Sequence, residues 1–319
     1  MKTKAEIPLR PAPQQVSTPD LDAASSLFDM LLSFAIQSTG HSGAIGGNMA
    51  SVKAVYVMTD MEGVAGIDAW DPRFEVAAGS LPAIYESRDM LHLLTAEVNA
   101  AILGLQDAGV EDIVVCDGHG SGRNLVMDEL VPGARIVRGI KRSEWLPKLD
   151  SHFGGLVQVG MHSMSNTPHG NLAHTMSTDI EHYQVNGRNV GEMELAAYLA
   201  GDHGVPWLFT SGDLHACREA ESWVPGIVTA AVKEGLSELC AVHLPPAQAR
   251  QLIRERVRLA VQQAANIKPL VAQPPVTLEI RRRKPGPDRV GPGGVRLDAF
   301  TVSYTGDSIS DVFYRATYA

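Results

Sequence analysis

The chain has 319 residues, of which 45% are hydrophobic and 20% are charged, a balance typical of a globular protein with a sizeable core. Its formal net charge of −9 argues against a nucleic acid or an anionic membrane surface as a partner. The 3 cysteines lack close spacing, and no run of about eighteen apolar residues predicts a membrane-spanning helix. We therefore expect a cytoplasmic protein.

The N-terminal region differs in composition from the rest. Prolines among polar side chains over residues 1–20 are typical of a flexible lead, and residues 21–37 have the pattern of one amphipathic helix. A stretch rich in glycine and serine follows at 38–48. The sequence predicts a flexible extension with one short helix over residues 1–52.

From residue 53 on, apolar runs alternate with helical patterns. Strands are expected at 54–60, 112–119, 134–139, 154–162 and 205–213, and helices at 88–109 and 189–204. Strands joined by helical crossovers form parallel sheets with helices on their faces. The fold class is therefore α/β, with a mostly parallel sheet covered by helices in a catalytic domain over residues 53–225.

The pattern changes after residue 225. A long helix with a charged face is expected at 245–266, and alternating strands at 276–283 and 299–306 flank a segment rich in proline and glycine. This predicts a smaller α+β C-terminal domain over residues 226–319. The basic cluster RRRK, 281–284, is interpreted as a solvated strand edge.

Polar side chains end three of the predicted strands. Asp60 and Glu62 follow the first strand, and residues i and i+2 of an extended chain point to the same side. His119 lies just past the second strand, and His162 ends the strand at 154–162. Because ligands gather beyond the carboxyl ends of parallel strands, we expect these side chains to meet in one crevice.

Two further side chains fit the same crevice. Glu192 lies near the start of the helix at 189–204, with Glu194 as a competing candidate because i and i+2 diverge on a helix. His174 lies on a polar segment after the third of these strands, where spacing alone leaves a surface histidine and a functional one equally open.

Carboxylates and imidazoles without cysteine suit zinc, manganese, cobalt or iron(II). Two histidines with three acidic residues exceed the three protein ligands of a single catalytic zinc. The surplus predicts two divalent metal ions that share a bridging carboxylate, an arrangement found in aminopeptidases and phosphatases.

The order of the motifs resembles that of the DppA-type D-aminopeptidases, which are dinuclear zinc metallopeptidases. The motifs are TDMEG at 59–63, DGH at 117–119, GMH at 160–162, AHTMS at 173–177 and VGEMELAAY at 190–198. The similarity runs from about residue 53 to near the C-terminus. It departs from the family at Gly118, where a serine is frequent, and over residues 66–85, which differ in length and content.

The resemblance implies a role for each site residue. Asp60 would bridge two zinc ions, Glu62 and His162 would complete one metal, and His119 and Glu192 the other. His174 matches the family's catalytic histidine. The family also implies a homodecamer of two stacked pentameric rings around a central channel.

The expected function is therefore a metal-dependent amide or peptide hydrolase, an aminopeptidase that releases N-terminal D-amino acids from short peptides or amides by a metal-activated water. Three alternatives stay open. The same site would also suit another small amide, hydrazide or dipeptide-like metabolite. A haloacid-dehalogenase phosphatase fits Glu62 and the histidines poorly, and a binding module with a structural metal would hold the ions without turnover.

Overall fold

The computed structural model describes residues 52–74, 81–287 and 290–318. These residues belong to one compact unit that spans Gly46–Ala319. The extension expected over residues 1–52 lies outside the described residues, apart from Val52. None of the described helices has the length and apolarity that crossing a membrane requires.

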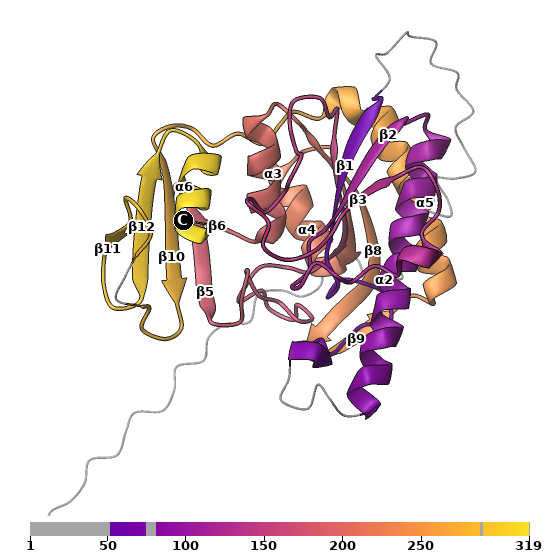
Figure 1. The fold of residues 1–319 in the computed structure, drawn as a ribbon, viewed down its shortest axis with the longest axis horizontal. Helices are drawn as coiled ribbons and strands as arrows, with labels where there is room; N and C mark the ends of the chain where they lie inside the picture. Colours follow the sequence, from indigo (N-terminus) through magenta and orange to yellow (C-terminus); the bar gives the residue numbers. More distant parts are fainter. Residues whose placement is uncertain (1–51, 75–80, 288–289, 319) are drawn as a thin grey trace, which may run out of the picture. The chain divides into compact units, whose positions relative to one another are not determined.

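The larger of two sheets has seven strands in the order β3-β2-β1-β4-β7-β8-β9, all parallel except β9, which pairs antiparallel with β8 (Figure 1). Their bounds are β1 Ala54–Thr59, β2 Asp112–Asp117, β3 Arg135–Val137, β4 Leu156–Met161, β7 Trp207–Asp213, β8 Val228–Ser237 and β9 Cys240–His243. Every residue of β1, β4 and β7 is buried. Such continuous burial is typical of parallel strands covered on both faces.

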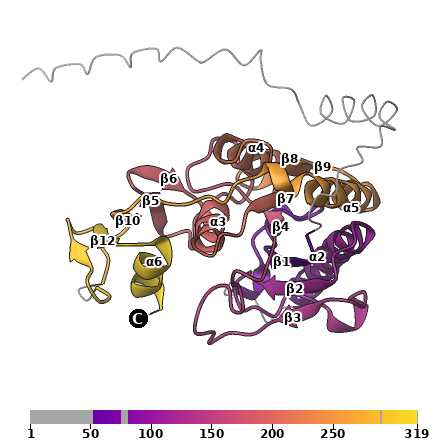
Figure 2. The ribbon, with the colours of Figure 1, turned by 90° about the horizontal axis from the view of Figure 1, so that it is seen from above.

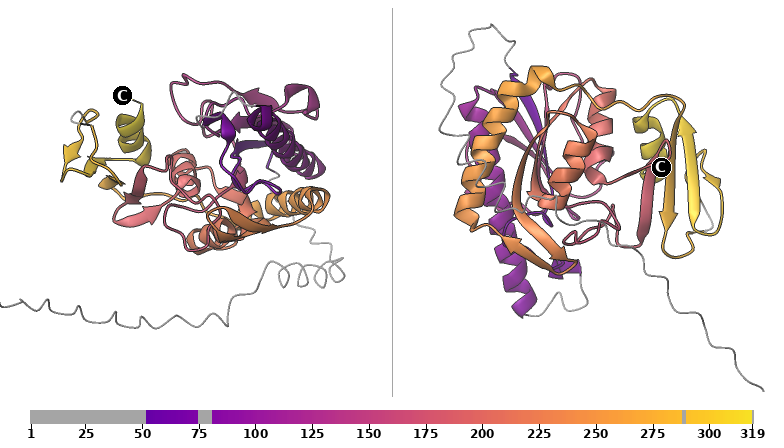
Figure 3. Two further views of the ribbon diagram at one scale, coloured as in Figure 1. Left: turned by 90° about the horizontal axis from the view of Figure 1, so that it is seen from below. Right: turned by 180° about the vertical axis from the view of Figure 1, so that it is seen from behind.

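Four helices provide that cover. Helix α2, Leu81–Asp107, packs along α5, Pro246–Gln263, on one face, and α3, Glu192–Asp202, and α4, Leu214–Trp223, lie on the other (Figures 2 and 3). Short 3₁₀ turns occur at Pro72–Phe74, Met127–Glu129 and Ala264–Asn266. The expected α/β fold with a mostly parallel, helix-covered sheet is confirmed.

The second sheet is antiparallel and has the order β11-β12-β10-β5-β6. Its strands are β5 Ile180–Val185, β6 Arg188–Val190, β10 Val276–Arg282, β11 Val295–Arg296 and β12 Thr301–Gly306, and helix α6, Ile309–Thr317, packs on β10 and β12. Strands β5 and β6 precede residue 225, whereas β8, β9 and α5 follow it and continue the large sheet. The boundary expected at 225/226 therefore does not separate the two sheets.

The interpretation of RRRK, 281–284, as a solvated strand edge is wrong. Strand β10 lies inside the second sheet, and Arg281 pairs with Thr301 of β12 on one side and His182 of β5 on the other. The charge of Arg281 is balanced by Glu181 and Asp298 through ion pairs of 3.0 and 3.2 Å. The basic cluster therefore marks the end of an interior strand.

The strand register brings the polar strand ends together. Thr59, the last residue of β1, pairs with Asp117 at the end of β2 and with Val159 of β4. The chains also approach closely, since a Cβ on Gly63 would lie 2.0 Å from the Met161 carbonyl oxygen. Only glycine fits there, so the glycine after the first two acidic residues lets the loop after β1 pass close to the end of β4.

Candidate metal centre

Asp60 lies between the imidazoles of His119 and His162, which follow the two strands on either side of β1. Its Oδ1 is 3.0 Å from His119 Nδ1, and its Oδ2 is 3.3 Å from His162 Nε2. The residue is only 4% exposed. One carboxylate therefore faces a different histidine with each oxygen, the geometry expected of a group shared between two cations.

Glu62 and Glu192 extend the cluster in opposite directions. Glu62 Oε2 lies 3.1 Å from His119 Nδ1, whereas Glu192 Oε1 lies 3.6 Å from His162 Nε2 and 3.7 Å from His174 Nε2. Ligand atoms of Asp60, Glu62 and His162 converge within 4.8 Å, and so do those of His162, His174 and Glu192. The structure thus brings all six predicted residues into one cluster, with Glu192 grouped beside His174 as well as His162.

Glu194, the competing candidate, has a different role. Its Oε2 accepts the backbone N–H of Gly191 at 2.8 Å and so caps the start of α3. Burial raises the pKa of Glu194, although its hydrogen bond with Glu219 opposes the shift, and burial together with the Glu194 charge raises the pKa of Glu219. Of the two glutamates on this turn, Glu192 is the one that contacts the histidines.

The charge of three carboxylates, the buried Asp60 and Glu62 and the half-buried Glu192, is met by imidazoles. None of the three forms an ion pair with a lysine or arginine among the described residues. Burial opposes charge here, but the pKa of Glu62 is still lowered, mainly by His119. Burial likewise opposes protonation of His162, yet Asp60 and Glu192 raise its pKa. The cluster therefore has a strong affinity for positive charge.

Two imidazoles have a fixed tautomer. Nδ1 of His162 lies 3.0 Å from the Ser163 carbonyl oxygen, and Nδ1 of His174 lies 2.9 Å from that of Leu172. Because a carbonyl only accepts, each Nδ1 donates its proton and each Nε2 holds a lone pair in the neutral ring. Within the described residues, His162 Nε2 and Glu62 Oε2 are buried and form no hydrogen bond. Each of these two atoms can supply an electron pair to zinc or a similar divalent metal.

Asp71 also joins the cluster, although no motif or spacing in the sequence indicated it. Its Oδ2 lies 3.5 Å from Nε2 of His119, on the side of the ring opposite Asp60. Arg73 holds Asp71 by an ion pair of 2.5 Å. Burial opposes its ionisation, but His119 and Arg73 keep the pKa of Asp71 well below its usual value. The residue comes from the loop after β1, outside any strand-end pattern.

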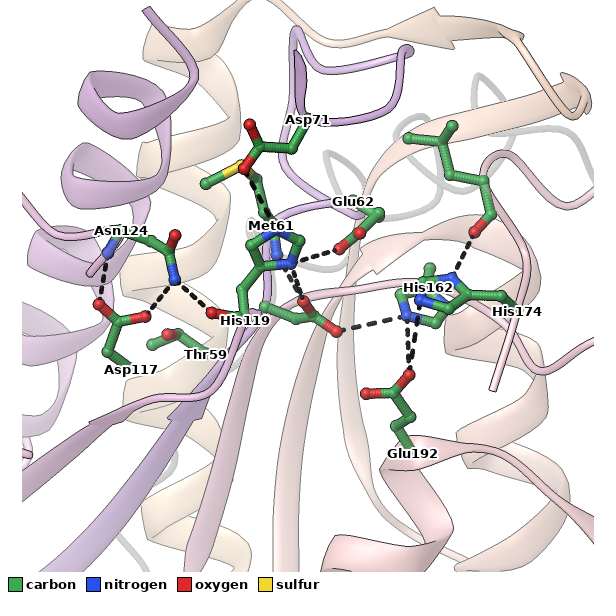
Figure 4. Close-up of polar contacts among 12 residues, drawn as sticks. Thr59, Met61, Glu62, Asp71, Asp117, His119, Asn124, His162, His174 and Glu192 are labelled. Carbon is green, nitrogen blue, oxygen red and sulfur yellow. Dashed lines mark hydrogen bonds and ion pairs between the residues drawn. The ribbon is translucent and has the colours of Figure 1, made fainter. Parts of the chain in front are cut away.

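Asp117 and Asn124 support His119 from behind. Asp117 accepts the backbone N–H and the side-chain amide of Asn124, and that amide also donates to the His119 carbonyl oxygen at 2.6 Å (Figure 4). The aspartate of the DGH motif therefore orients the loop after β2 rather than facing the cluster.

A buried lysine fixes the loop after β1. Lys233, on β8, is fully buried and donates to the carbonyl oxygens of Glu62 and Ile67 and to Asn171 Oδ1. Burial lowers its pKa to about 8 despite the nearby Asp213 and Glu62 charges. Lys233 thus connects the loop that carries Glu62 with the segment that carries His174.

A cavity of about 400 Å³ adjoins His174. The edge of the Trp70 ring packs on the imidazole of His174 with a centroid distance of 5.3 Å. The cavity is lined by Trp70, Ser165, Asn166, Thr167, His169, Gly170, Ala173, His174, Thr178, Glu238 and Arg283. Its volume is within the range of small-molecule sites. A ligand in this cavity therefore contacts His174, one member of the cluster.

Comparisons with known proteins agree with one another. A family model described as D-aminopeptidase, Peptidase_M55, matches residues 54–317. A D-aminopeptidase of Bacillus subtilis strain 168 is 35% identical over 217 residues, which is 68% of this chain and 76% of that protein. A solved structure superposes with a TM-score of 0.72 at 29% identity, over 82% of this chain and 94% of the other. It is the Zn-dependent D-aminopeptidase DppA from Bacillus subtilis, called a self-compartmentalizing protease.

Proposed function

The chain belongs to the D-aminopeptidase family, and on that premise we propose that it releases N-terminal D-amino acids from short peptides or amides with two zinc ions per subunit. It is a metal-dependent aminopeptidase, as the sequence motifs predicted. These relatives do not favour the alternative, in which the same site hydrolyses another small amide, hydrazide or dipeptide-like metabolite.

The observation that carries the proposal is the position of Asp60. Its two carboxylate oxygens face His119 and His162 separately, at 3.0 and 3.3 Å, which supports a carboxylate that two ions would share. We propose that Glu62, His119, His162 and Glu192 hold the ions together with it. When bound, paired zinc ions lower the pKa of a water and polarise the scissile carbonyl.

The remaining chemistry belongs to His174. Its Nδ1 donates to the Leu172 carbonyl oxygen, so Nε2 of the neutral ring is free to accept a proton and return it to the departing amine. Stacking on His162, with ring centroids 4.1 Å apart, and the edge of Trp70 hold the ring in place. We propose His174 as the catalytic acid and base.

The test combines metal analysis with a panel of D- and L-aminoacyl amides. We expect about two zinc ions per chain and turnover of D-alanine amide in preference to its L-enantiomer. His174→Ala is expected to lose about 10²- to 10⁴-fold in kcat while its zinc content stays unchanged. His152→Ala, at an exposed histidine paired with Asp112, serves as the control.

Two results would contradict the proposal. A protein that holds two zinc ions but hydrolyses no aminoacyl amide would be a binding module. Loss of zinc together with turnover in His174→Ala would make His174 a metal ligand rather than the catalytic group.

We further propose that the enzyme is a cytoplasmic homo-oligomer, and a decamer by resemblance to its family. Apolar side chains at and beyond the end of β8 and on β9 are exposed, namely Leu236, Leu239 and Val242, at 49%, 57% and 50%. Such side chains together suit a subunit contact. The free cysteines Cys116, Cys217 and Cys240 fit a reducing compartment.

A further inference from the structure

The side chains of the basic cluster at 281–284 differ in whether they have an acidic partner. Arg281 is paired with Glu181 and Asp298, and Lys284 with Asp179 at 3.2 Å. Among the described residues, Arg283 has no carboxylate within ion-pair distance. Its charge is therefore not balanced by the fold.

Neutral groups nevertheless hold the Arg283 guanidinium in a defined position. Its Nε donates to the Thr178 carbonyl oxygen at 3.2 Å, and its Nη2 donates to Asn166 Oδ1 at 2.9 Å. Its backbone N–H donates to the Asp179 carbonyl oxygen at 2.8 Å. A guanidinium has five N–H groups, so the side chain keeps donors for a ligand while its orientation is set.

Arg283, Asn166 and Thr178 all line the cavity that adjoins His174. A ligand that contacts His174 inside this cavity therefore also meets an arginine without an acidic partner. Glu238 is the acidic side chain of the same wall, so the cavity suits a ligand of low net charge and not a polyanion. Guanidinium binds carboxylate through two parallel hydrogen bonds, the strongest match available to it.

We propose that Arg283 binds the free C-terminal carboxylate of short peptide substrates, which makes the enzyme selective for di- and tripeptides over amidated peptides. The inference rests on the proposed peptidase function. The scissile bond would lie at His174, and the leaving residues would extend through the cavity to Arg283. A cavity of about 400 Å³ limits how many residues follow the scissile bond.

The test compares D-Ala-D-Ala with the same dipeptide amidated at its C-terminus, for the wild type and for Arg283→Gln. We expect the wild type to prefer the free dipeptide. Arg283→Gln should lower kcat/KM for the free dipeptide by about 10- to 100-fold, through KM, and change the amide by no more than about twofold. Arg283→Lys, which keeps a point charge, should recover part of the loss.

Arg282→Gln is the matched control, because it removes the same charge from the neighbouring residue, which does not line the cavity. It should leave both substrates unchanged. Equal losses on both substrates in Arg283→Gln would overturn the inference and assign the arginine to holding the loop around Thr178. Equal wild-type rates on both substrates would also overturn it. Hydrolysis of neither by the wild type would instead refute the proposed function, and this inference with it.

Discussion

At the scale of single residues, Asp71 shows how a ligand is held from its far side. If His119 binds metal through Nδ1, which faces Asp60, then Nε2 is left to donate to Asp71, 3.5 Å away. Carboxylates behind metal-bound histidines fix the ring and increase its basicity. Arg73 prevents Asp71 from turning away, since it is bound to both Asp71 and Asn124.

Asp71→Asn is therefore expected to weaken zinc binding or activity by about 10- to 100-fold without unfolding the protein. The measurement is zinc affinity by competition with a chelating dye, together with kcat on D-alanine amide. Asp68→Asn, an exposed aspartate on the same loop, is the matched control. Unchanged zinc affinity and unchanged turnover in Asp71→Asn would remove Asp71 from the site.

The strand-end residues of the site could be predicted from the sequence, whereas Asp71 could not. Parallel strands end at one edge of a sheet, so side chains that follow buried strands are predicted to lie close together. This applies to Asp60, Glu62, His119 and His162. Asp71 comes from a loop whose path depends on Arg73 and Asn124, a partner about 50 residues further on. No local spacing reports such a contact.

At the scale of elements, helix α2 and strand β8 hold the loop after β1 from two sides. Glu97 of α2 accepts the N–H of Ala65 at 2.9 Å, and Lys233 of β8 donates to the carbonyl oxygens of Glu62 and Ile67. Both side chains are buried, and burial raises the pKa of Glu97 and lowers that of Lys233, each to about 8. This loop is thus fixed by groups whose charge depends on pH.

Ionisation of Glu97 lowers the free energy of unfolding as the pH rises from 4.5 to about 8. Burial raises its pKa to about 8 from an ordinary value of 4.5, although Ala65 and Lys233 oppose the shift. Between these two values the folded state keeps a proton that the unfolded state has released, so the free energy of unfolding falls as the pH rises. Glu97→Gln should remove that dependence.

We therefore expect the difference in thermal midpoint, Glu97→Gln minus wild type, to be larger at pH 8 than at pH 5. Differential scanning calorimetry at the two pH values measures it. Glu111→Gln, an exposed glutamate paired with Lys53, should show no such change. A difference that is the same at both pH values would mean that Glu97 is ionised in the folded protein.

Among the elements, the central strands follow from hydrophobic pattern, because strands buried on both faces are continuous apolar runs. Helices α2, α3 and α5 follow from helical periodicity, whereas α4, Leu214–Trp223, was not predicted. The second sheet was harder to foresee. Strand β5 pairs with β10 across about a hundred residues, as in Tyr183 with Ile280, and no periodicity records which distant strand will be the neighbour. For the same reason, the sequence did not show that RRRK, 281–284, ends a strand with a neighbour on each side.

At the scale of the whole molecule, the candidate metal centre brings carboxylates of the loop after β1 close to the start of α3. Asp60, Glu62 and Glu192 are three carboxylates in a buried cluster, and histidines are their charged neighbours among the described residues. A cation that binds only the folded protein adds to its stability.

Removal of metal by a chelator should therefore lower the thermal midpoint, and added zinc should restore it. The measurement is thermal unfolding at constant pH before chelation, after chelation and after addition of zinc. Calcium, which prefers six to eight oxygen ligands, should not restore the midpoint. A midpoint that chelation leaves unchanged would show that the carboxylates are balanced within the chain.

The pairing of β5 with β10 also decides when the enzyme is completed during its synthesis. All five proposed metal ligands have been synthesised once Glu192 is made, but the strand that anchors β5 begins only at Val276. The segment that carries His174 lies directly before β5, and Arg283 holds its Asn166 and Thr178. A transcript cut short before that point encodes a full set of ligands without the anchor of the catalytic segment. The segment that carries His174 is therefore held by residues that are synthesised after the last proposed ligand.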